Sequence, residues 1–162
     1  MFKGRGFTLI ELLVTVSIIA ILSAIGLVVY SNVIKQGQDS KRQSDLRSIQ
    51  SALEQYYSDQ GFYPAGNLPF GSSLNNCTGN PTSPCSSTKT YINNVPNDSN
   101  VNIPYRYEAV RNGSIGCTNA TTATQCNSYC LTSKLDIPPS PIPSLPTGCS
   151  YSSDYNFFVS PP

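Results

Sequence analysis

The sequence predicts an α+β fold in which one long N-terminal α-helix packs on a small antiparallel β-sheet. Three observations support this prediction. An almost uninterrupted apolar run covers residues 7–30, apolar residues at helical spacing follow it, and short alternating segments bounded by Gly, Pro and Asn occupy the second half of the chain. The 162 residues leave room for one modest globular domain besides the apolar segment.

The apolar run carries a single charged residue, Glu11, and follows a leader in which Lys3 and Arg5 are the only charges. At about 1.5 Å per helical residue, residues 7–30 are long enough to cross a hydrocarbon core of roughly 30 Å. The positive charges before the run predict a cytoplasmic N-terminus and place the remainder outside the membrane. A carboxylate within such a span is energetically costly, so Glu11 indicates a function.

The stretch KGRGFTLIE, residues 3–11, resembles the class III signal sequence of type IV pilins and pseudopilins. The resemblance implies that residues 1–6 are a prepilin leader. A prepilin peptidase on the cytoplasmic side would cut after Gly6 and methylate the new terminus, Phe7. The resemblance also implies that Glu11 guides docking and packing in a filament. An ordinary secretory signal is cut after its apolar core, whereas this cut precedes the core and leaves it in the mature protein.

Residues 31–64 are predicted to form the amphipathic half of the long helix, which Gly61 and Pro64 end. The run ALEQYYSDQGFYP resembles the end of the long helix in pilins and in the major pseudopilin of type II secretion. A continuous helix over both halves is on the order of 78 Å long, too long for so small a domain to bury. The apolar residues of the second half recur at helical spacing: Leu46, Ile49, Leu53, Tyr56 and Tyr57.

Residues 65–162 are predicted to form an extracellular β domain that contains disulfides. Alternation of apolar and polar residues predicts a strand over 105–110, with an antiparallel return strand over 129–136 and a last strand over 155–159. We expect residues 65–90 to be an irregular connection. The proline-rich residues 138–146 are expected to run as extended polyproline over the surface.

Six cysteines lie beyond the apolar segment: Cys77, Cys85, Cys117, Cys126, Cys130 and Cys149. An even number in a translocated domain predicts disulfides in an oxidising compartment. The alternative of a thiolate metal site is disfavoured because the chain has no histidine and no C-x2-C pair. Sequence proximity suggests the pairs Cys77–Cys85, Cys117–Cys126 and Cys130–Cys149, which are one of fifteen possible arrangements.

The composition argues against an enzyme. The absence of histidine removes the commonest general base, and no nucleotide-binding motif is present, so we expect no catalytic, cofactor-binding or metal-binding residues. The net charge is +1, and removing Lys3 and Arg5 with the leader leaves a side-chain balance of −1. This balance argues against bulk electrostatic attraction to nucleic acid, although the sequence leaves a nucleic-acid partner open.

Two charged clusters have competing interpretations. The first cluster consists of Asp98, Asp136 and Asp154. These residues invite comparison with the calcium site of the major pseudopilin of type II secretion, but the favoured interpretation is that they cap turns. The other is a basic cluster that can meet DNA or anionic lipid: Lys41, Arg42 and Arg47. Because Asp39 and Asp45 are interleaved with it, a solvated helix face is the favoured interpretation.

The resemblance as a whole implies a structural subunit of a type IV pilus. Such a subunit waits in the cytoplasmic membrane, meets the prepilin peptidase and the pilus assembly machinery, and then polymerises with its own copies into an extracellular filament for adhesion, motility or DNA uptake. A pseudopilin of a type II secretion or competence system is the nearest alternative, and a membrane-anchored extracellular binding module is the second. Many pilins have a proline where this chain has Val28.

Overall fold

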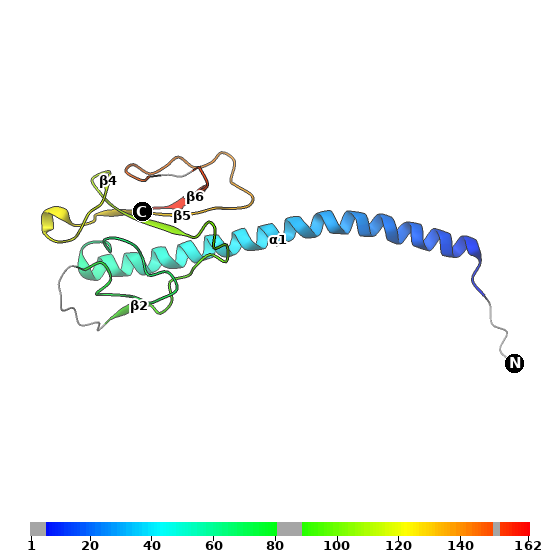
Figure 1. The fold of residues 1–162 in the computed structure, drawn as a ribbon, viewed down its shortest axis with the longest axis horizontal. Coiled ribbons are helices and arrows are strands. Elements are labelled where there is room, and N and C mark those ends of the chain that lie inside the picture. The colour runs from blue at the N-terminus through cyan, green and yellow to red at the C-terminus, as the bar shows by residue number, and fades with distance from the viewer. Residues whose placement is uncertain (1–5, 81–88, 151–152) are drawn as a thin grey trace. The chain divides into compact units, whose positions relative to one another are not determined.

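The structure is a computed structural model that describes residues 6–80, 89–150 and 153–162, apart from the side chain of Val28. The chain divides into two compact units, Met1–Gly37 and Gln38–Pro162. Its elements, shown in Figure 1, confirm the predicted α+β class. They are α1 (Leu9–Gln60), β1 (Leu74–Asn75), β2 (Thr90–Ile92), β3 (Arg106–Arg111), β4 (Ser114–Ile115), the short 3-10 helix η1 (Thr122–Thr124), β5 (Ser128–Ser133) and β6 (Phe157–Val159).

The long helix α1 ends where the sequence predicts. Gly61 has a φ of 77°, a left-handed conformation that glycine adopts without steric cost. Its N–H donates to the carbonyl oxygen of Tyr57 at 2.8 Å, which closes the last turn. Pro64, three residues further on, has no N–H with which to continue the helix.

Four strands form an antiparallel sheet in the order β4-β3-β5-β6, and β1 and β2 form a separate two-stranded sheet. In the register of β3 and β5, Tyr107 lies opposite Leu131 and Ala109 lies opposite Tyr129. The strands predicted over 105–110, 129–136 and 155–159 correspond to β3, β5 and β6. Strands β1, β2 and β4 were not predicted, and β1 lies within the stretch expected to be irregular.

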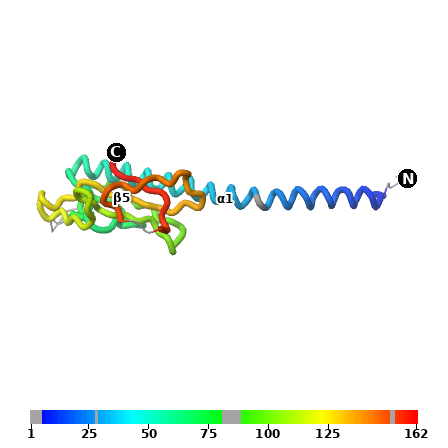
Figure 2. Tube along the Cα trace, turned by 90° about the horizontal axis from the view of Figure 1, so that it is seen from above, coloured from blue at the N-terminus to red at the C-terminus, as the bar shows by residue number. Residues whose placement is uncertain are grey.

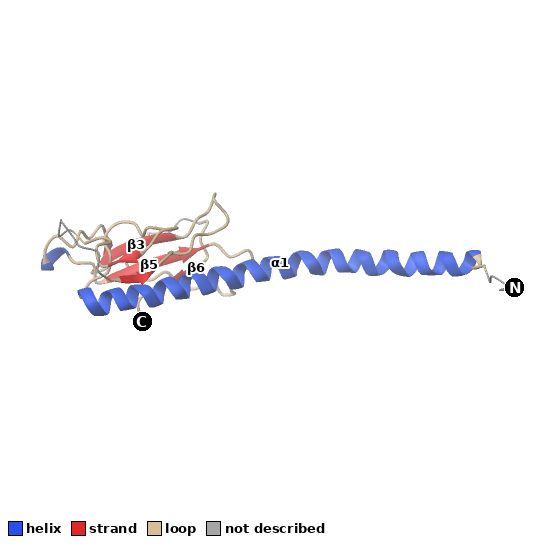
Figure 3. Cartoon of the chain, turned by 90° about the horizontal axis from the view of Figure 1, so that it is seen from below, coloured by secondary structure: helices blue, strands red, loops and turns tan. Residues whose placement is uncertain are grey.

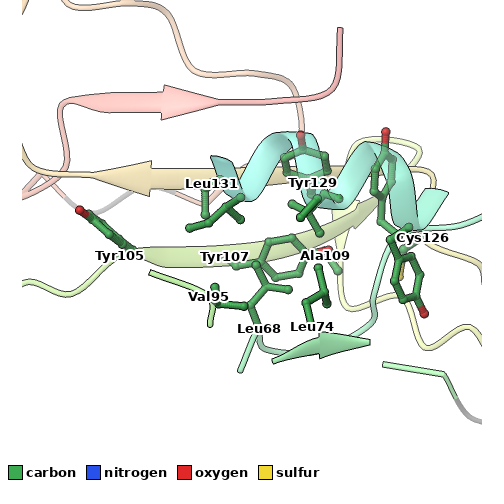
Figure 4. Packing of buried hydrophobic residues seen from close by; sticks show 14 of the residues in the cluster. Leu68, Leu74, Val95, Tyr105, Tyr107, Ala109, Cys126, Tyr129 and Leu131 are labelled. Carbon is green, nitrogen blue, oxygen red and sulfur yellow. The ribbon is translucent and has the colours of Figure 1, made fainter. Parts of the chain in front are cut away.

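In the Gln38–Pro162 unit, Figure 3 shows the second half of α1 running along the four-stranded sheet. The core is formed by side chains of this half of α1, of the sheet and of the segment between α1 and β3, which contains β1 and β2. The predicted helical stripe is buried, with Leu46, Ile49, Leu53 and Tyr56 at 0% exposure. Tyr57, which the same pattern includes, is 40% exposed. The close view in Figure 4 shows the side chains that meet this stripe, among them Leu68, Leu74, Val95, Tyr107, Tyr129 and Leu131.

Two disulfides join segments of this unit within the described residues. Cys117 pairs with Cys126 and Cys130 pairs with Cys149, at Cα–Cα distances of 5.3 and 5.9 Å. These are two of the three pairs expected from sequence proximity. Cys85 lies outside the described residues, and the expected pair of Cys77 with Cys85 lies outside them with it. The proline-rich residues 138–146 contain neither helix nor strand and are mostly exposed.

Candidate functional site: an apolar helix with a capped carboxylate

The first half of α1 exposes its apolar side chains all around the helix. All residues in the ranges 6–27 and 29–38 are exposed, and Phe7 reaches 90%. An 18-residue window in α1 has a mean hydropathy of 2.8, so the described residues contain one helix that is long and apolar enough to cross a membrane. Water disfavours so large an apolar surface, so a bilayer or other protein chains must cover it.

Glu11 and Thr8 form a capping box at the start of α1. The backbone N–H of Thr8 donates to Glu11 Oε2 at 2.8 Å, and the Thr8 hydroxyl donates to the same oxygen at 2.9 Å. In return, the backbone N–H of Glu11 donates to Thr8 Oγ1 at 3.3 Å. These bonds satisfy N–H groups that a helix start leaves without partners. Glu11 Oε1 takes part in none of the three bonds.

A hollow of about 450 Å³ lies beside this capping box, lined by Phe7, Glu11, Leu12 and Thr15. The hydroxyl of Thr15 donates to the carbonyl oxygen of Leu12 at 2.9 Å, so it is already engaged within the helix. Of the four lining residues, only Glu11 carries a charge. Apolar walls around a single carboxylate are chemically suited to a cationic group carried on an apolar chain.

The predicted cleavage position lies just before the helix. Gly6, Phe7 and Thr8 are exposed and precede the first residue of α1, Leu9. The peptide bond between Gly6 and Phe7 is therefore in non-helical backbone. A Cβ atom built on Gly6 meets nothing within 4 Å, so the surroundings of this chain place no steric demand for glycine there.

The basic cluster in the second half of α1 is not the solvated helix face that the sequence predicts, because Arg42 is buried. Arg42 is only 7% exposed and Asp39 only 5%, so neither belongs to a solvated helix face. The Nε group of Arg42 donates to Asp98 at 3.0 Å, and its Nη1 donates to Asp39 at 2.9 Å and to Asp136 at 2.8 Å. Lys41 and Arg47 remain exposed.

The environment of Arg42 keeps its guanidinium charged. Burial disfavours the charged form, but the hydrogen bonds to Asp136 and Asp39 and the charge of Asp98 outweigh it, so the pKa of Arg42 is raised above its ordinary value. Asp39 also accepts the backbone N–H groups of Asp136 and Ile137, each at 2.8 Å. The network therefore joins α1 to two loops that lie far away in the sequence.

The comparison with a calcium site finds little support in this geometry. Asp98 and Asp136 both bind the guanidinium of Arg42, and Asp154 is not among its carboxylate partners. Asp98 also accepts the N–H of Asn100 at 2.9 Å, as a turn-capping aspartate does. Within the described ranges, no three or more His, Cys, Asp or Glu side chains are grouped to hold a metal ion.

Glu54, on the buried side of α1, accepts hydrogen bonds from two tyrosines of the globular unit. The hydroxyl of Tyr63 lies 3.0 Å from Glu54 Oε2, and that of Tyr129 lies 3.1 Å from Oε1. Burial and the neighbouring Glu54 carboxylate raise the pKa of Tyr129 well above its ordinary value. The sequence does not reveal this contact, because Glu54 and the two tyrosines belong to no common motif.

A long helix with an uncovered apolar half and a small α+β domain defines a class of proteins that must assemble in a membrane or a polymer. Residues 1–27 match the family described as "Prokaryotic N-terminal methylation motif", and residues 30–119 match "Type II secretion system (T2SS), protein G". The chain belongs to the type IV pilin and type II secretion pseudopilin family, whose members are structural proteins.

Similar proteins are pilins and fimbrial proteins. The type IV major fimbrial protein FimA of Dichelobacter nodosus is 35% identical over 120 residues, which are 74% of this chain and 69% of FimA. The fimbrial protein EcpC of Eikenella corrodens is 40% identical over 67 residues, or 41% of this chain and 44% of EcpC. The type IV major pilin protein PilE of Neisseria gonorrhoeae is 34% identical over 67 residues, 41% of this chain and 40% of PilE.

The chain thus spans less than half the length of EcpC and PilE in these matches and about two thirds of FimA. No solved structure is significantly similar to it.

Proposed function

We propose that this chain is a structural subunit of a type IV pilus, cut between Gly6 and Phe7 and polymerised through the apolar half of α1. The observation that carries the proposal is the exposed apolar half of α1 with its capped carboxylate. The membership of the family and the relatives that are named as pilins support it. The fibre supports adhesion, motility or DNA uptake.

Before assembly, the apolar half of α1 anchors the subunit in the cytoplasmic membrane with its N-terminus inside. The prepilin peptidase removes the leader and methylates Phe7, and the assembly machinery then moves the subunit into the filament. There the apolar helices bundle in the core, and the disulfide-containing units form the surface. The same segment is thus a membrane span in one state and a packing element in the other.

Glu11 has a specific part in this exchange. Cleavage frees the amine of Phe7, which is mostly protonated at neutral pH because the ordinary pKa of an α-amino group is about 7.7–8.0. Glu11 of one subunit neutralises the amine of a neighbour in the hollow beside Leu12 and Thr15. A paired charge is tolerated in apolar surroundings, whereas a lone carboxylate is costly.

Two substitutions separate the charge of Glu11 from its role in the helix start. Glu11→Gln keeps the capping box, because glutamine serves at this position, but removes the charge. We expect it to abolish or severely reduce filaments. Thr8→Ala removes the capping hydroxyl at a cost of about 1 kcal/mol to the helix start and keeps the charge, so filaments should persist. Electron microscopy and immunoblotting of sheared surface filaments measure both outcomes.

The amount of each variant in the membrane fraction is the control, because a subunit that is degraded cannot assemble. Wild-type numbers of filaments from Glu11→Gln, at equal membrane levels, would contradict the role given to the charge. Loss of filaments with Thr8→Ala alone would assign the effect to helix capping instead.

A pseudopilin of a secretion or competence system is the second candidate, and the match of residues 30–119 to the type II secretion protein G family favours it. The FimA match supports the pilin over a larger share of the chain. Immunogold labelling with an antibody against the globular unit separates the two. Label along surface filaments supports the pilin, and label confined to the cell envelope supports the pseudopilin.

A further inference from the structure

Two loops of the Gln38–Pro162 unit carry large apolar side chains that the described chain leaves uncovered. Val101 is 84% exposed in the loop before β3, and Ile137 and Ile142 are 44% and 52% exposed in the loop after β5. Figures 1 and 2 show these loops, green and orange-brown, reaching the same end of the unit. We call Val101, Ile137 and Ile142 the apolar end.

The Arg42 network fixes both loops to α1. Arg42 binds Asp98, three residues before Val101, and Asp136, the residue before Ile137. Asp39 accepts the backbone N–H of Ile137 itself at 2.8 Å. Ile137 is therefore held at the part of α1 that contains residues 39 and 42, and Val101 lies three residues from a contact with it. Ile142 follows Ile137 by five residues in the same loop.

This part of α1 cannot be far from the end of the membrane segment. Ile34 is the last large apolar residue of the exposed half of α1, and five Cα–Cα steps separate it from Asp39. Because a chain extends by at most about 3.6 Å per residue, Asp39 stays within about 18 Å of Ile34. Because the N–H of Ile137 donates to Asp39, Ile137 in the loop after β5 also stays close to Ile34.

We propose that the apolar end rests on the outer surface of the phospholipid bilayer that holds the apolar half of α1. Val101, Ile137 and Ile142 enter the boundary between headgroups and acyl chains, where exposed apolar side chains lose contact with water. The contact belongs to the waiting subunit and is released when the subunit enters a filament. The inference rests on the proposed function, because it needs the subunit to be anchored before assembly.

The charges at this end allow such a contact. Asp39 and Asp98 are buried, and all three carboxylates of the network bind Arg42. None of the three therefore faces the headgroups as an unpaired carboxylate, which would oppose an anionic surface. Lys41, exposed one residue before Arg42, adds a positive charge that anionic headgroups attract.

A bilayer suits the apolar end better than a second copy of the chain. A stable protein interface buries about 800 Å² on each partner with close shape complementarity, which three side chains on two loops do not provide. A lipid surface needs no shape complementarity. Because the anchor already holds the unit near the membrane, even a weak contact is populated by its high effective concentration.

Tryptophan fluorescence tests the proposal, because the chain contains no tryptophan and each variant then has a single fluorophore. Val101→Trp and Ile142→Trp probe the two loops. Ile115→Trp is the matched control, since Ile115 is 54% exposed on β4 at the other end of the unit. Ile19→Trp reports on the anchor. The full chain is placed in vesicles of phosphatidylcholine and phosphatidylglycerol, with or without brominated acyl chains, which quench tryptophan on contact.

We expect the brominated chains to quench Val101→Trp, Ile142→Trp and Ile19→Trp and to leave Ile115→Trp unchanged. Quenching of Ile19→Trp alone would overturn the inference and leave the proposed anchor intact. If Ile19→Trp is not quenched, both the inference and the proposed membrane anchor are contradicted. Emission shifts that follow protein density rather than bromination would show contact with a second copy and would also overturn it. The two loop probes lie on different segments, so misfolding of one variant leaves the other to decide.

Discussion

At the scale of single residues, Arg42 occupies the point where α1 meets two distant loops. Its three carboxylate partners lie at positions 39, 98 and 136, and two of them, Asp39 and Asp98, are almost completely buried. Buried carboxylates need a compensating partner, because desolvation of an unpaired charge is costly. Arg42 therefore holds the loops in place by making their charges tolerable.

Replacing this one side chain should destabilise the globular unit strongly. Arg42→Met keeps much of the volume but leaves Asp39 and Asp98 without a cation, and we expect a loss of about 3–5 kcal/mol in the free energy of unfolding. Lys41→Met is the control: Lys41 is exposed, and its replacement should change stability by no more than about 0.5 kcal/mol. Urea unfolding of the full chain in detergent micelles compares them. Equal midpoints for the two variants would show that the network contributes little.

The sequence could not distinguish Arg42 from its basic neighbours. Lys41, Arg42 and Arg47 have the same charge within one helical segment, and the pattern suggested a solvated face. The partners that decide the matter, Asp98 and Asp136, lie 56 and 94 residues away, so no local spacing reveals them. Glu11 is recognisable because it is the single charge in a local apolar run and lies in the motif of residues 3–11. Its capping box with Thr8 is a finding of the structure.

At the scale of elements, β5 is joined to α1 by Tyr129, whose side chain is fully buried and whose hydroxyl binds Glu54. The ring of Tyr129 also lies 4.8 Å from that of Tyr63 and 5.9 Å from that of Tyr107, measured between centroids. Such aromatic contacts add to the stability that burial gives. The junction between α1 and the sheet thus depends on tyrosine side chains in their neutral form.

This junction makes stability depend on alkaline pH. An unfolded tyrosine ionises near pH 10, but burial and Glu54 raise the pKa of Tyr129 in the folded protein well above that value. The contribution of Tyr129 is therefore complete below about pH 10 and declines as the pH rises toward the folded pKa, by up to about 1.4 kcal/mol per pH unit.

Tyr129→Phe removes the titrating group and keeps the ring. We expect the variant to be less stable than the wild type at neutral pH, by about 1 kcal/mol for the lost hydrogen bond, but to lose stability less steeply above about pH 10. Urea unfolding of both proteins across this range measures the two slopes. Parallel pH profiles would exclude Tyr129 as a source of the dependence.

The regular elements were predictable where their periodicity is long enough to be seen. The stripe from Leu46 to Tyr56 marks the buried face of α1, and the alternation over 105–110 marks β3. Strands β1, β2 and β4 have only two or three residues each, too few to show an alternation. They exist because the surrounding chain brings their partners together, which is information that the local sequence does not contain.

At the scale of the whole molecule, one half of α1 has a covering sheet, and the described residues supply no cover for the other half. A disulfide-fastened globular unit with a buried core accounts for residues beyond Gln38, whereas the exposed apolar half requires an environment that a single chain does not supply. The proposed pilus subunit meets this requirement twice, first with a bilayer and then with the helices of its neighbours.

N-terminal sequencing and intact-mass measurement of the subunit from sheared surface filaments show whether the chain is processed and polymerised as a pilin. We expect a chain that begins at Phe7, carries a methyl group on its amine and retains the apolar half of α1. A chain that retains Met1, or that is cut beyond Tyr30, would contradict processing as a pilin. A subunit missing from such filaments would contradict its role as their building block.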